Sequence, residues 1–201
     1  QGPMDVLDHS CSKLGFGGKM CIDGTWKYDE EKQDEISVDD SLIFNKDEIL
    51  NKYPEVVKIN DSLLAMDITC LLVSVKKNRV GHVRQLHENI AGAIKGIKMI
   101  LYVEDSVDAN DLPVALWRFC NNVDPRRDSM LVNNCMGFDG TIKTKELDNF
   151  QRDWPNIIVA DELTIRSVDD KWSKLGIGDF IPSPSLKFAD QLYGNEAVVN
   201  V

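Results

Sequence analysis

The feature that most constrains the fold is a change in hydrophobic period between residues 68 and 95. Residues 68–75 read Ile-Thr-Cys-Leu-Leu-Val-Ser-Val, an almost continuous apolar and β-branched run that is typical of a strand covered on both faces. After a polar turn at 76–79, apolar residues recur at three- and four-residue steps from Gly81 to Lys95, which predicts a helix with one apolar face. Gly96 then stands where the C-terminus of a helix favours glycine.

The same alternation continues along the chain. Residues 97–103 form a second apolar run, Asp111 is placed to cap a helix over 111–121, and residues 129–132 are a third candidate strand. We therefore expect an α/β fold, a layered α/β/α arrangement with a mostly parallel sheet and helices at 82–95 and 111–121 packed on it. A further strand at 157–159 and a terminal helix at 163–175 complete the predicted elements.

The composition supports one domain with a buried core. Of the 201 residues, 43% are apolar and 28% are charged, which is an ordinary balance for a globular protein. We expect a single α/β domain over residues 1–201, with its main core at 66–180. Residues 1–65 are less regular and include a short helix at 46–53 that ends at Pro54. Because the chain opens without an initiator Met, we expect it to be a piece of a longer protein.

The net charge limits the partners. Lys and Arg number 23 against 33 Asp and Glu, so the chain carries a formal charge of −10 that repels nucleic acid and anionic membrane surfaces. No apolar run approaches the roughly 20 residues that a bilayer span needs. Five cysteines, an odd number spread over the chain, indicate reduced thiols. These features predict a cytoplasmic protein with no nucleic-acid partner and no membrane span.

No motif for a cofactor or a metal is complete. The sequence Gly-Phe-Gly-Gly-Lys at 15–19 lacks the first Gly and the hydroxyl residue of a phosphate-binding loop. Cys11 and Cys21 do not have the Cys-x-x-Cys spacing of a zinc site. His82 and His87 lie five residues apart, so a helix places them on different faces, and we expect both at the surface. We therefore predict no catalytic residue and no bound metal or cofactor for this chain.

Acids and arginines gather at the predicted edge of the sheet. Asp105 and Asp108 follow the strand at 97–103, at the edge where open α/β sheets bind ligands. Asp124, Arg127 and Asp128 belong to the turn Asp-Pro-Arg-Arg-Asp after the next helix. We expect these five residues to form a structural network in which Arg127 pairs with Asp105 or Asp108. Helix capping is an equally good reason for the acids at this place.

A six-residue pattern occurs twice. Ile-Asp-Gly-Thr-Trp-Lys at 22–27 matches Phe-Asp-Gly-Thr-Ile-Lys at 138–143 at four of its six positions, which suggests a duplicated loop. We expect the loops around Asp23 and Asp139 to occupy related places near one edge of the sheet.

The order and spacing of several segments resemble the C-terminal domain of the UbiD-type decarboxylases. These segments are Gly81-His82-Val83-Arg84, Tyr102-Val103-Glu104-Asp105-Ser106-Val107-Asp108, Leu116-Trp117, Asp124-Pro125-Arg126-Arg127-Asp128 and the closing Val168-Asp169-Asp170-Lys171-Trp172-Ser173-Lys174-Leu175-Gly176. The segment from Leu7-Asp8-His9-Ser10 to Ile22-Asp23-Gly24-Thr25 resembles the family's Leu-Asp segment and its Ile-Asp-Ala-Thr-x-Lys signature.

Two departures from the family pattern stand out. The signature usually follows the Asp-Pro turn, whereas here the better copy precedes the turn and Phe138-Asp139-Gly140-Thr141 remains behind it, as if the pieces were duplicated or permuted. Asn122 occupies the place of an Arg that commonly precedes the turn, which puts any anion-binding duty of that position in doubt.

The resemblance implies a carboxy-lyase that removes carbon dioxide from an aromatic carboxylic acid without oxidation, as in quinone biosynthesis. It implies prenylated FMN with a divalent metal and potassium, held by a flavin-binding N-terminal domain of the same longer chain. This chain would then close the substrate pocket and build a homo-oligomer, through Trp172 and residues 181–188, and would be inactive alone. The alternative is a free-standing binding or regulatory α/β module without catalysis.

The resemblance also suggests residues for the wall of the substrate pocket. Asn133, Asn134, Met136 and Phe138 match the loop that lines the pockets of the family, and they follow the strand at 129–132, whose end should face the crevice. An ordinary surface loop explains them equally well.

Overall fold

The computed structural model describes residues 10–13, 25–31 and 41–192. The chain forms two compact units, residues 1–151 and residues 152–201. The core that we expected at 66–180 crosses the boundary at residues 151–152. The first unit, which we call the sheet unit, also includes residues before 66. Asp23, at the centre of the first six-residue copy, lies outside the described residues, so the predicted relation between the two loops stays a prediction.

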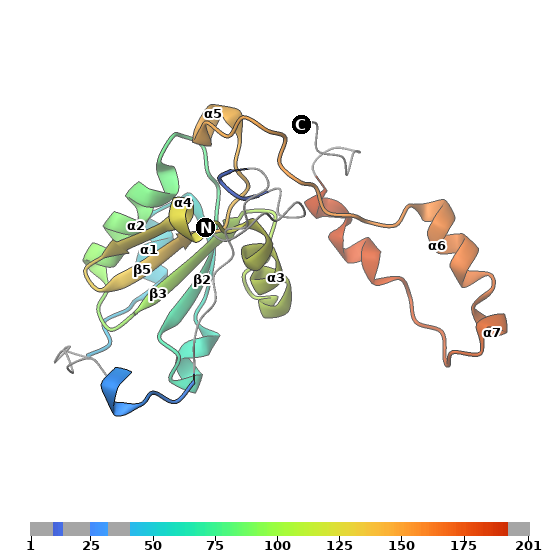
Figure 1. The fold of residues 1–201 in the computed structure, drawn as a ribbon, viewed down its shortest axis with the longest axis horizontal. Helices are drawn as coiled ribbons and strands as arrows, with labels where there is room; N and C mark the ends of the chain where they lie inside the picture. The colour runs from blue at the N-terminus through green and yellow to red at the C-terminus, as the bar shows by residue number, and fades with distance from the viewer. Residues whose placement is uncertain (1–9, 14–24, 32–40, 193–201) are drawn as a thin grey trace. The chain divides into compact units, whose positions relative to one another are not determined.

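The first unit is built on a five-stranded sheet with the order β1-β2-β3-β5-β4. The strands are β1 (Val56–Asn60), β2 (Cys70–Val75), β3 (Met99–Glu104), β4 (Ser129–Val132) and β5 (Cys135–Asp139). Strands β2, β3 and β5 run parallel at the centre, while β1 and β4 run antiparallel at the two edges (Figure 1). The α/β fold class and the three predicted strands are confirmed, and β1 and β5 are additional.

The direction of β4 differs from the parallel arrangement that the alternation favoured. β4 and β5 are joined by two residues, Asn133 and Asn134, with φ of 48° and 60°. A two-residue turn with positive φ at both positions makes a tight hairpin, whereas a parallel connection needs a dozen or more residues. Val132 therefore pairs with Cys135, and β4 returns antiparallel along β5.

Helices cover both faces of the sheet. α2 (His82–Ala93) and α3 (Leu112–Asn122) match the predicted helices at 82–95 and 111–121, and lie on opposite sides of the strands (Figure 1). Neighbouring residues of β5 show the two faces: Gly137 lies under the His87 ring of α2, and Phe138 packs edge-on against Phe119 of α3. The predicted short helix is present as α1 (Lys46–Lys52).

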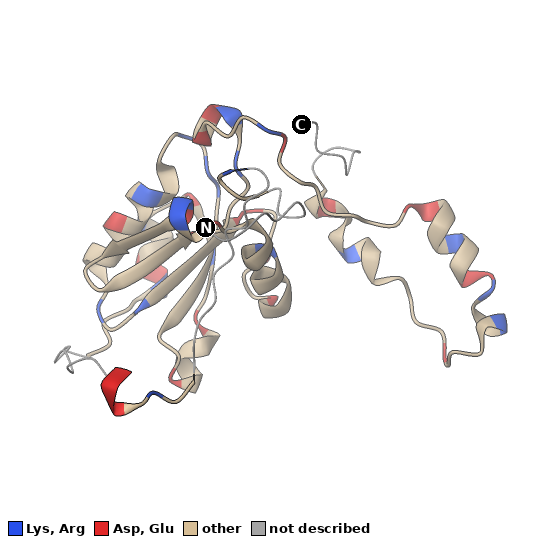
Figure 2. Cartoon of the chain, viewed as in Figure 1, with Lys and Arg blue, Asp and Glu red and all other residues tan. Residues whose placement is uncertain are grey.

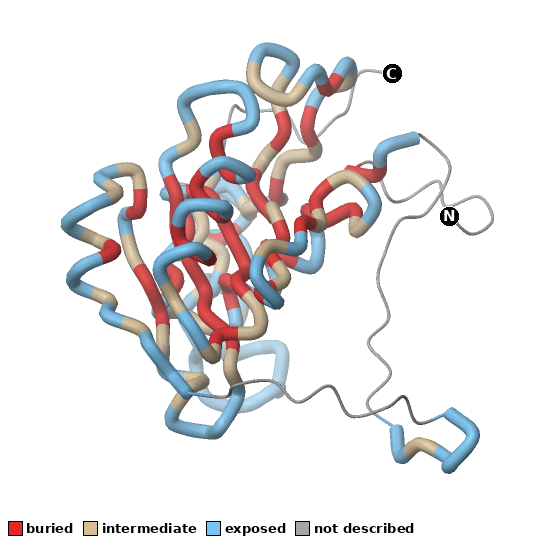
Figure 3. The backbone as a smooth tube through the Cα atoms, turned by 90° about the vertical axis from the view of Figure 1, so that its left-hand side faces the viewer, coloured by how far each residue is buried: buried red, intermediate tan, exposed pale blue. Residues whose placement is uncertain are grey.

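The core lies between α2 and the sheet. Val83, Leu86 and Ile90 repeat at the helical period on the buried side of α2 and pack with Val73 and Ile100 of the central strands. In Figure 3 the strands of the first unit are largely buried. In the hydrocarbon-transfer picture, each such aliphatic side chain contributes about 1.5 to 3 kcal/mol when it is fully buried.

Both histidines of α2 are buried, so the prediction of surface histidines was wrong. His82 and His87 are 1% and 0% exposed. The Nε2 of His87 donates to the Cys135 carbonyl at 3.1 Å, and its Nδ1 then accepts from the Tyr102 hydroxyl at 3.1 Å. Burial lowers the pKa of His87. Hydrogen bonding at both nitrogens lets a polar ring lie within the core, which the spacing of two histidines cannot reveal.

Gly96 serves a close backbone approach instead of capping the helix. α2 ends at Ala93 with Ile94 as its C-cap, and Gly96 has φ of 80°. A Cβ at this position would lie 2.9 Å from the Cα of Leu42 and from the carbonyl oxygen of Ser41. A glycine is therefore required where the segment before α1 passes the segment before β3.

The remaining elements are short. In the first unit they are α4 (Pro125–Asp128), α5 (Lys145–Asp148) and the 3-10 turns η1 (Asp29–Glu31) and η2 (Ser62–Met66). The second unit contains α6 (Glu162–Asp169), α7 (Trp172–Leu175) and η3 (Pro184–Gln191). The predicted helix at 163–175 is thus broken near Asp170, and residues 157–159 form no strand. Within the described ranges, no helix has the length and hydropathy of a membrane span.

Candidate functional site

A small charged pocket lies at the carboxyl ends of the parallel strands. It encloses about 180 Å³ between the start of α2, α4, α5 and the loop that follows β5. We call it the edge pocket, and its charged lining residues are Lys77, Arg84, Arg127, Asp128, Asp139, Lys143 and Asp148. α4 and α5 each carry both signs of charge (Figure 2). Open α/β sheets bind ligands at this edge, so it is the candidate site.

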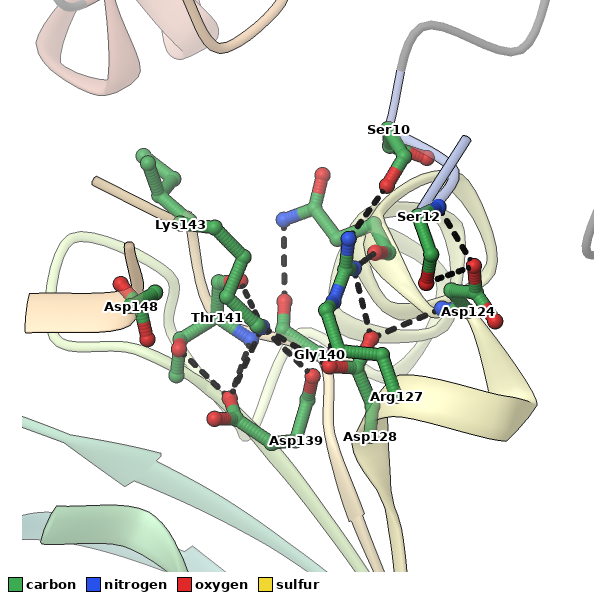
Figure 4. A network of polar contacts seen from close by, with 12 residues as sticks. Ser10, Ser12, Asp124, Arg127, Asp128, Asp139, Gly140, Thr141, Lys143 and Asp148 are labelled. Atoms are coloured by element: carbon green, nitrogen blue, oxygen red, sulfur yellow. Dashed lines mark hydrogen bonds and ion pairs between the residues drawn. The ribbon is translucent and has the colours of Figure 1, made fainter. Parts of the chain in front are cut away.

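Lys143 lies at the centre of the edge pocket. Its ammonium donates to the carbonyl oxygens of Asp139 and Thr141 at 2.8 and 2.6 Å (Figure 4). It is also 3.2 Å from Oδ1 of Asp139 and 3.6 Å from Oδ1 of Asp128. The Lys143 side chain is only 3% exposed. A buried ammonium needs such partners because its desolvation is otherwise costly.

Asp139 ends β5 and is held ionised. Burial would raise its pKa, but Lys143, Lys77 and two hydrogen bonds from Thr141 outweigh burial and lower the pKa below its usual value. The Thr141 amide and hydroxyl donate to Oδ1 of Asp139 at 3.0 and 2.5 Å. Gly140 lies between them, and a Cβ there would lie 2.7 Å from the Phe119 ring. The Asp-Gly-Thr sequence therefore fits a tight loop packed on α3.

Arg127 and Asp128 of α4 form the second part of the network. Nε and Nη2 of Arg127 donate to the two carboxylate oxygens of Asp128, both at 2.7 Å. The Asp128 side chain is 1% exposed and also accepts from the Asp124 amide at 2.8 Å. A bidentate pair fixes the guanidinium plane, and Arg127 also donates outside α4, to the carbonyls of Ser10 and Asn122 at 2.7 and 3.2 Å.

Ser10 and Ser12 are hydrogen-bonded to α4 and to its N-cap residue, Asp124. The amide and hydroxyl of Ser12 donate to Oδ2 of Asp124 at 2.6 and 2.5 Å, and Nη1 of Arg127 donates to the Ser10 carbonyl at 2.7 Å. Burial of Asp124 would raise its pKa, but the bonds from Ser12 and Arg126 and the nearby Arg127 lower it. Residues more than 110 positions apart are thereby joined.

Lys77 closes the other side of the edge pocket. It follows β2 and donates to the Ile142 carbonyl at 2.6 Å and to both carboxylate oxygens of Asp148 at 2.9 and 2.8 Å. Asp148 also accepts from the Thr144 amide at 2.8 Å. Arg84 is exposed at the mouth, where its Nη2 is 3.5 Å from the Ser129 carbonyl.

A further buried pair braces β3 and was missed in the sequence. The guanidinium of Arg118 on α3 contacts the carboxylate of Glu104, which ends β3, and both side chains are at most 10% exposed. Asn122 donates to the Gly140 carbonyl at 2.9 Å. Arg118 lies on the buried face of α3 with Val114, Ala115 and Phe119. Its position in this helical repeat is the sequence feature that could have predicted a buried arginine.

The structure brings together three of the five predicted network residues. Asp124, Arg127 and Asp128 lie together at the edge of the sheet, as expected. Asp105 is exposed, and Asp108 pairs with Lys58 at 2.9 Å. Hydrogen bonds from Asn110 and Lys58 lower the pKa of Asp108. The prediction that Arg127 pairs with Asp105 or Asp108 was wrong, because the adjacent Asp128 accepts from Nε and Nη2 of Arg127, and Nη1 donates to the Ser10 carbonyl.

The four predicted pocket-wall residues do not follow a strand that ends at this edge. Because β4 runs antiparallel, Asn133 and Asn134 lie at the amino ends of the parallel strands, opposite the edge pocket. They line an open depression of about 410 Å³ together with residues 94–98. Phe138 is 5% exposed against Phe119. The argument that these four residues face the ligand-binding crevice because they follow the strand at 129–132 was therefore wrong. Their role in the substrate pocket of a longer protein stays a prediction.

The edge pocket is small for a flavin, and the pKa of its Asp139 carboxyl is shifted away from that of a general acid. Sites for drug-sized ligands and cofactors enclose roughly 300 to 1,000 Å³, against about 180 Å³ here. The pKa of Asp139, which lines the pocket, is lowered, whereas an acid that protonates a carbanion near neutral pH needs a raised one. No group of three or more His, Cys, Asp or Glu able to hold a metal occurs in the part of the chain that the structure describes. The geometry is that of a locked structural edge.

The sequence profile of the 3-octaprenyl-4-hydroxybenzoate carboxy-lyase C-terminal domain matches residues 44–152. The chain belongs to the UbiD decarboxylase family. The match coincides with the sheet unit from the start of α1 to its end. It includes both the Asp-Pro turn at 124–128 and Phe138–Lys143, whereas the first six-residue copy at 22–27 lies outside it, so the duplication or permutation stays a prediction.

Among curated proteins, two uncharacterized proteins of Helicobacter pylori resemble this UbiD domain. The protein of strain ATCC 700392 / 26695 is 30% identical over 156 residues, and that of strain J99 is 29% identical over 156 residues. Each alignment covers 77% of this chain but 24% of the relative. The chain therefore spans about a quarter of the length of the curated relatives that it matches.

Solved structures of UbiD-class enzymes also match. Vanillic acid decarboxylase of Sedimentibacter hydroxybenzoicus, in its open form, is 18% identical with a TM-score of 0.46 over 65% of this chain and 31% of its own. An evolved dimeric form of the UbiD-class enzyme HmfF of Pelotomaculum thermopropionicum, in complex with prFMN, is 17% identical with a TM-score of 0.43 over 48% of this chain and 23% of its own.

Proposed function

We propose that this chain is the C-terminal α/β part of a longer non-oxidative decarboxylase that acts on an aromatic carboxylic acid in quinone or other aromatic-acid metabolism. The observation that supports this most is the family match over residues 44–152, which spans the whole five-stranded sheet. In this proposal the domain closes the substrate pocket, and the chemistry takes place elsewhere in the protein.

The geometry of the edge pocket supports a structural part in that enzyme. A decarboxylase needs an electron sink, a cation that orients the carboxylate and an acid of raised pKa. Here the cations Lys77, Arg127 and Lys143 are engaged by carboxylates and carbonyls. A prenylated flavin, with its divalent metal and potassium, would therefore be held by a flavin-binding domain that precedes this one, and would supply the electron sink there.

The alternative is a free-standing binding or regulatory module that kept the fold. The length of the relatives favours the first proposal, because this chain covers 24% of each. The genomic reading frame distinguishes the two. Several hundred in-frame residues before Gln1 support the enzyme, and an initiator Met close to Gln1 supports the module.

The decisive experiment compares two proteins with the same assay. The protein encoded by the whole reading frame and the 201-residue chain are each mixed with prenylated FMN, manganese and potassium, and flavin absorbance and carbon dioxide release from a panel of aromatic acids are followed. We expect flavin binding and decarboxylation from the longer protein and neither from the chain. Turnover by the chain alone, or a flavin-loaded longer protein that is inert on the whole panel, would contradict the proposal.

We also propose self-association through the second unit. It exposes Phe180, Ile181 and Leu186 by 54, 64 and 59%, and an excised domain tends to expose apolar surface that was once an interface. Trp172 packs edge-on against Phe180 in the same segment. Light scattering at high concentration should show an oligomer that the double substitution Ile181→Ser and Leu186→Ser reduces. A wild-type chain that scatters as a monomer argues against this surface.

A pocket-wall role for Asn133, Asn134, Met136 and Phe138 is best tested at the exposed Asn134 in the longer protein. Phe138 is unsuitable, because a buried Phe→Ala change costs about 3 to 5 kcal/mol. If Asn134→Ala changes the preference among aromatic acids, the role is supported. An unchanged preference would remove Asn134 from the wall.

A further inference from the structure

The oxygens around the Lys143 ammonium converge from a very short piece of chain. The carbonyls of Asp139 and Thr141 and the Oδ1 of Asp139 lie 2.8, 2.6 and 3.2 Å from Nζ. A fourth oxygen, Oδ1 of Asp128, approaches from α4 at 3.6 Å. The carbonyls of Asp139 and Thr141 and Oδ1 of Asp139 thus belong to the five-residue loop that also carries Lys143, and Oδ1 of Asp128 comes from a separate element.

Such a convergence requires a positive charge at its centre. Carbonyl dipoles and carboxylates that point at one place repel one another, and the side chains of Lys143 and Asp128 have little contact with solvent, since they are 3% and 1% exposed. Rings of carbonyl oxygens that replace the hydration shell are how proteins hold a dehydrated monovalent cation. An ammonium group and a potassium ion are similar in charge and size, so the same oxygens can serve either.

We propose that the loop 139–143 is a monovalent-cation cage in which the Lys143 ammonium is the resident ion, tethered to the loop that it organises. Lys143 is then a positioning residue. It holds the carbonyls of Asp139 and Thr141 in place and ties the loop to α4 through Asp128. This inference does not depend on the proposed decarboxylase, because it concerns the folding of this chain alone.

The competing explanation is an ordinary buried ion pair. In that case, loss of the Lys143 charge destabilises the domain and no dissolved ion compensates, because the space closes or fills with water. The two explanations differ in one observable, which is a stabilisation that depends on the identity of the dissolved cation.

The test is Lys143→Ala in the 201-residue chain, which removes the tethered ammonium and opens the path of its side chain. Thermal unfolding is followed by circular dichroism in ammonium, potassium and tetramethylammonium chloride at equal ionic strength. We expect the Tm of the variant to rise with ammonium or potassium by about 3 to 5 °C for each tenfold increase above the dissociation constant. Tetramethylammonium, which is too large for the cage, should not produce this rise.

Three controls make the result specific. The wild-type chain corrects for general salt effects and should show no difference between the cations. Lys145→Ala, at an exposed lysine two residues away, should behave as the wild type does. Lys143→Met removes the charge but fills the side-chain path, so it should be destabilised like Lys143→Ala without any recovery in ammonium or potassium.

The inference fails if folded Lys143→Ala shows the same Tm in all three salts. If this variant is unfolded in tetramethylammonium chloride, the fraction that refolds in each salt is the readout, and refolding in ammonium or potassium supports the cage. Failure to refold in every salt rejects it, as does equal recovery of Lys143→Met.

Discussion

The two ends of the parallel strands are closed by different means. At the carboxyl ends, the edge pocket is held by buried ion pairs among Lys77, Arg127, Asp128, Lys143 and Asp148. At the amino ends the closure is made by backbone. The amides and carbonyls of residues 43 and 95 exchange hydrogen bonds at 3.0 and 2.9 Å, and the β4–β5 hairpin turns on two asparagines.

The difference separates two kinds of structural information. The backbone closure consists of one tight turn and one close approach of two segments. It requires residues that tolerate a positive φ and, at Gly96, the absence of a Cβ. The ionic closure includes pairs that are distant in sequence, such as Lys77 with Asp148, and it depends on the charges of the side chains. Breaking a buried pair leaves an uncompensated charge, whereas a turn stores a smaller strain energy. Substitutions at the two edges test this contrast.

The largest effect is expected at Asp128. Asp128→Asn keeps the shape of the side chain but leaves Arg127 and Lys143 without their shared carboxylate, which is 1% exposed. We expect the free energy of unfolding to fall by about 3 to 5 kcal/mol, measured by urea denaturation. Asp105→Asn, at an exposed acid near the same edge, should change it by less than about 0.5 kcal/mol. Equal effects of the two substitutions would remove the distinction between buried and exposed charge.

An intermediate effect is expected at Gly96 on the opposite edge. Gly96→Ala places a Cβ 2.9 Å from the backbone of residues 41 and 42 at a φ of 80°. Strained backbone of this kind costs about 1 to 3 kcal/mol. Gly92→Ala is the matched control, because Gly92 lies in α2 with no atom within 4 Å of its ideal Cβ. That control should stabilise by roughly 0.5 to 1 kcal/mol, and destabilisation by both substitutions would argue against the close approach.

A smaller effect is expected in acid at the ionic edge. The folded-state pKa of Asp139 lies below its usual value of 3.8. Its charge therefore contributes stability that is present above about pH 4 and is lost as the pH falls through the lowered pKa. The difference in unfolding free energy between the wild type and Asp139→Asn should shrink when urea titrations move from pH 6 to pH 3. A difference that stays constant over this range would mean that the Asp139 charge is not what stabilises the loop.

The sequence predicts the elements with a strong period. β2, β3, α2 and α3 each have a long apolar run or a clear helical repeat, and all four were placed correctly. β5 was missed because Cys-Met-Gly-Phe-Asp has neither a continuous apolar run nor a clean alternation. β4 runs antiparallel because the two adjacent asparagines Asn133 and Asn134 form a tight turn. This turn signal is not part of the apolar pattern from which the strands were predicted.

The candidate site is only partly readable from sequence. The Asp-Pro-Arg-Arg-Asp turn marked Asp124, Arg127 and Asp128, and the structure brings these together. Lys77 and Lys143 were not singled out, because lysines are almost never fully buried unless they are paired, and the partners can be far away in sequence. Lys77 contacts Asp148, 71 positions further on, and only the folded chain shows that proximity.

The smallest effect is expected at Asn134, in the hairpin of the backbone-closed edge. Its φ of 60° is favourable for Gly, tolerable for Asn and unfavourable for Ala. We expect Asn134→Ala to lower the free energy of unfolding by about 1 kcal/mol and Asn134→Gly to change it by less than about 0.5 kcal/mol, both by urea denaturation. Neither difference should vary between pH 6 and pH 3, because no charge is involved, in contrast to Asp139. If Asn134→Ala is as stable as Asn134→Gly, or if its effect depends on pH, then conformational strain is not what this edge demands, and the contrast between the two ends of the sheet would not hold.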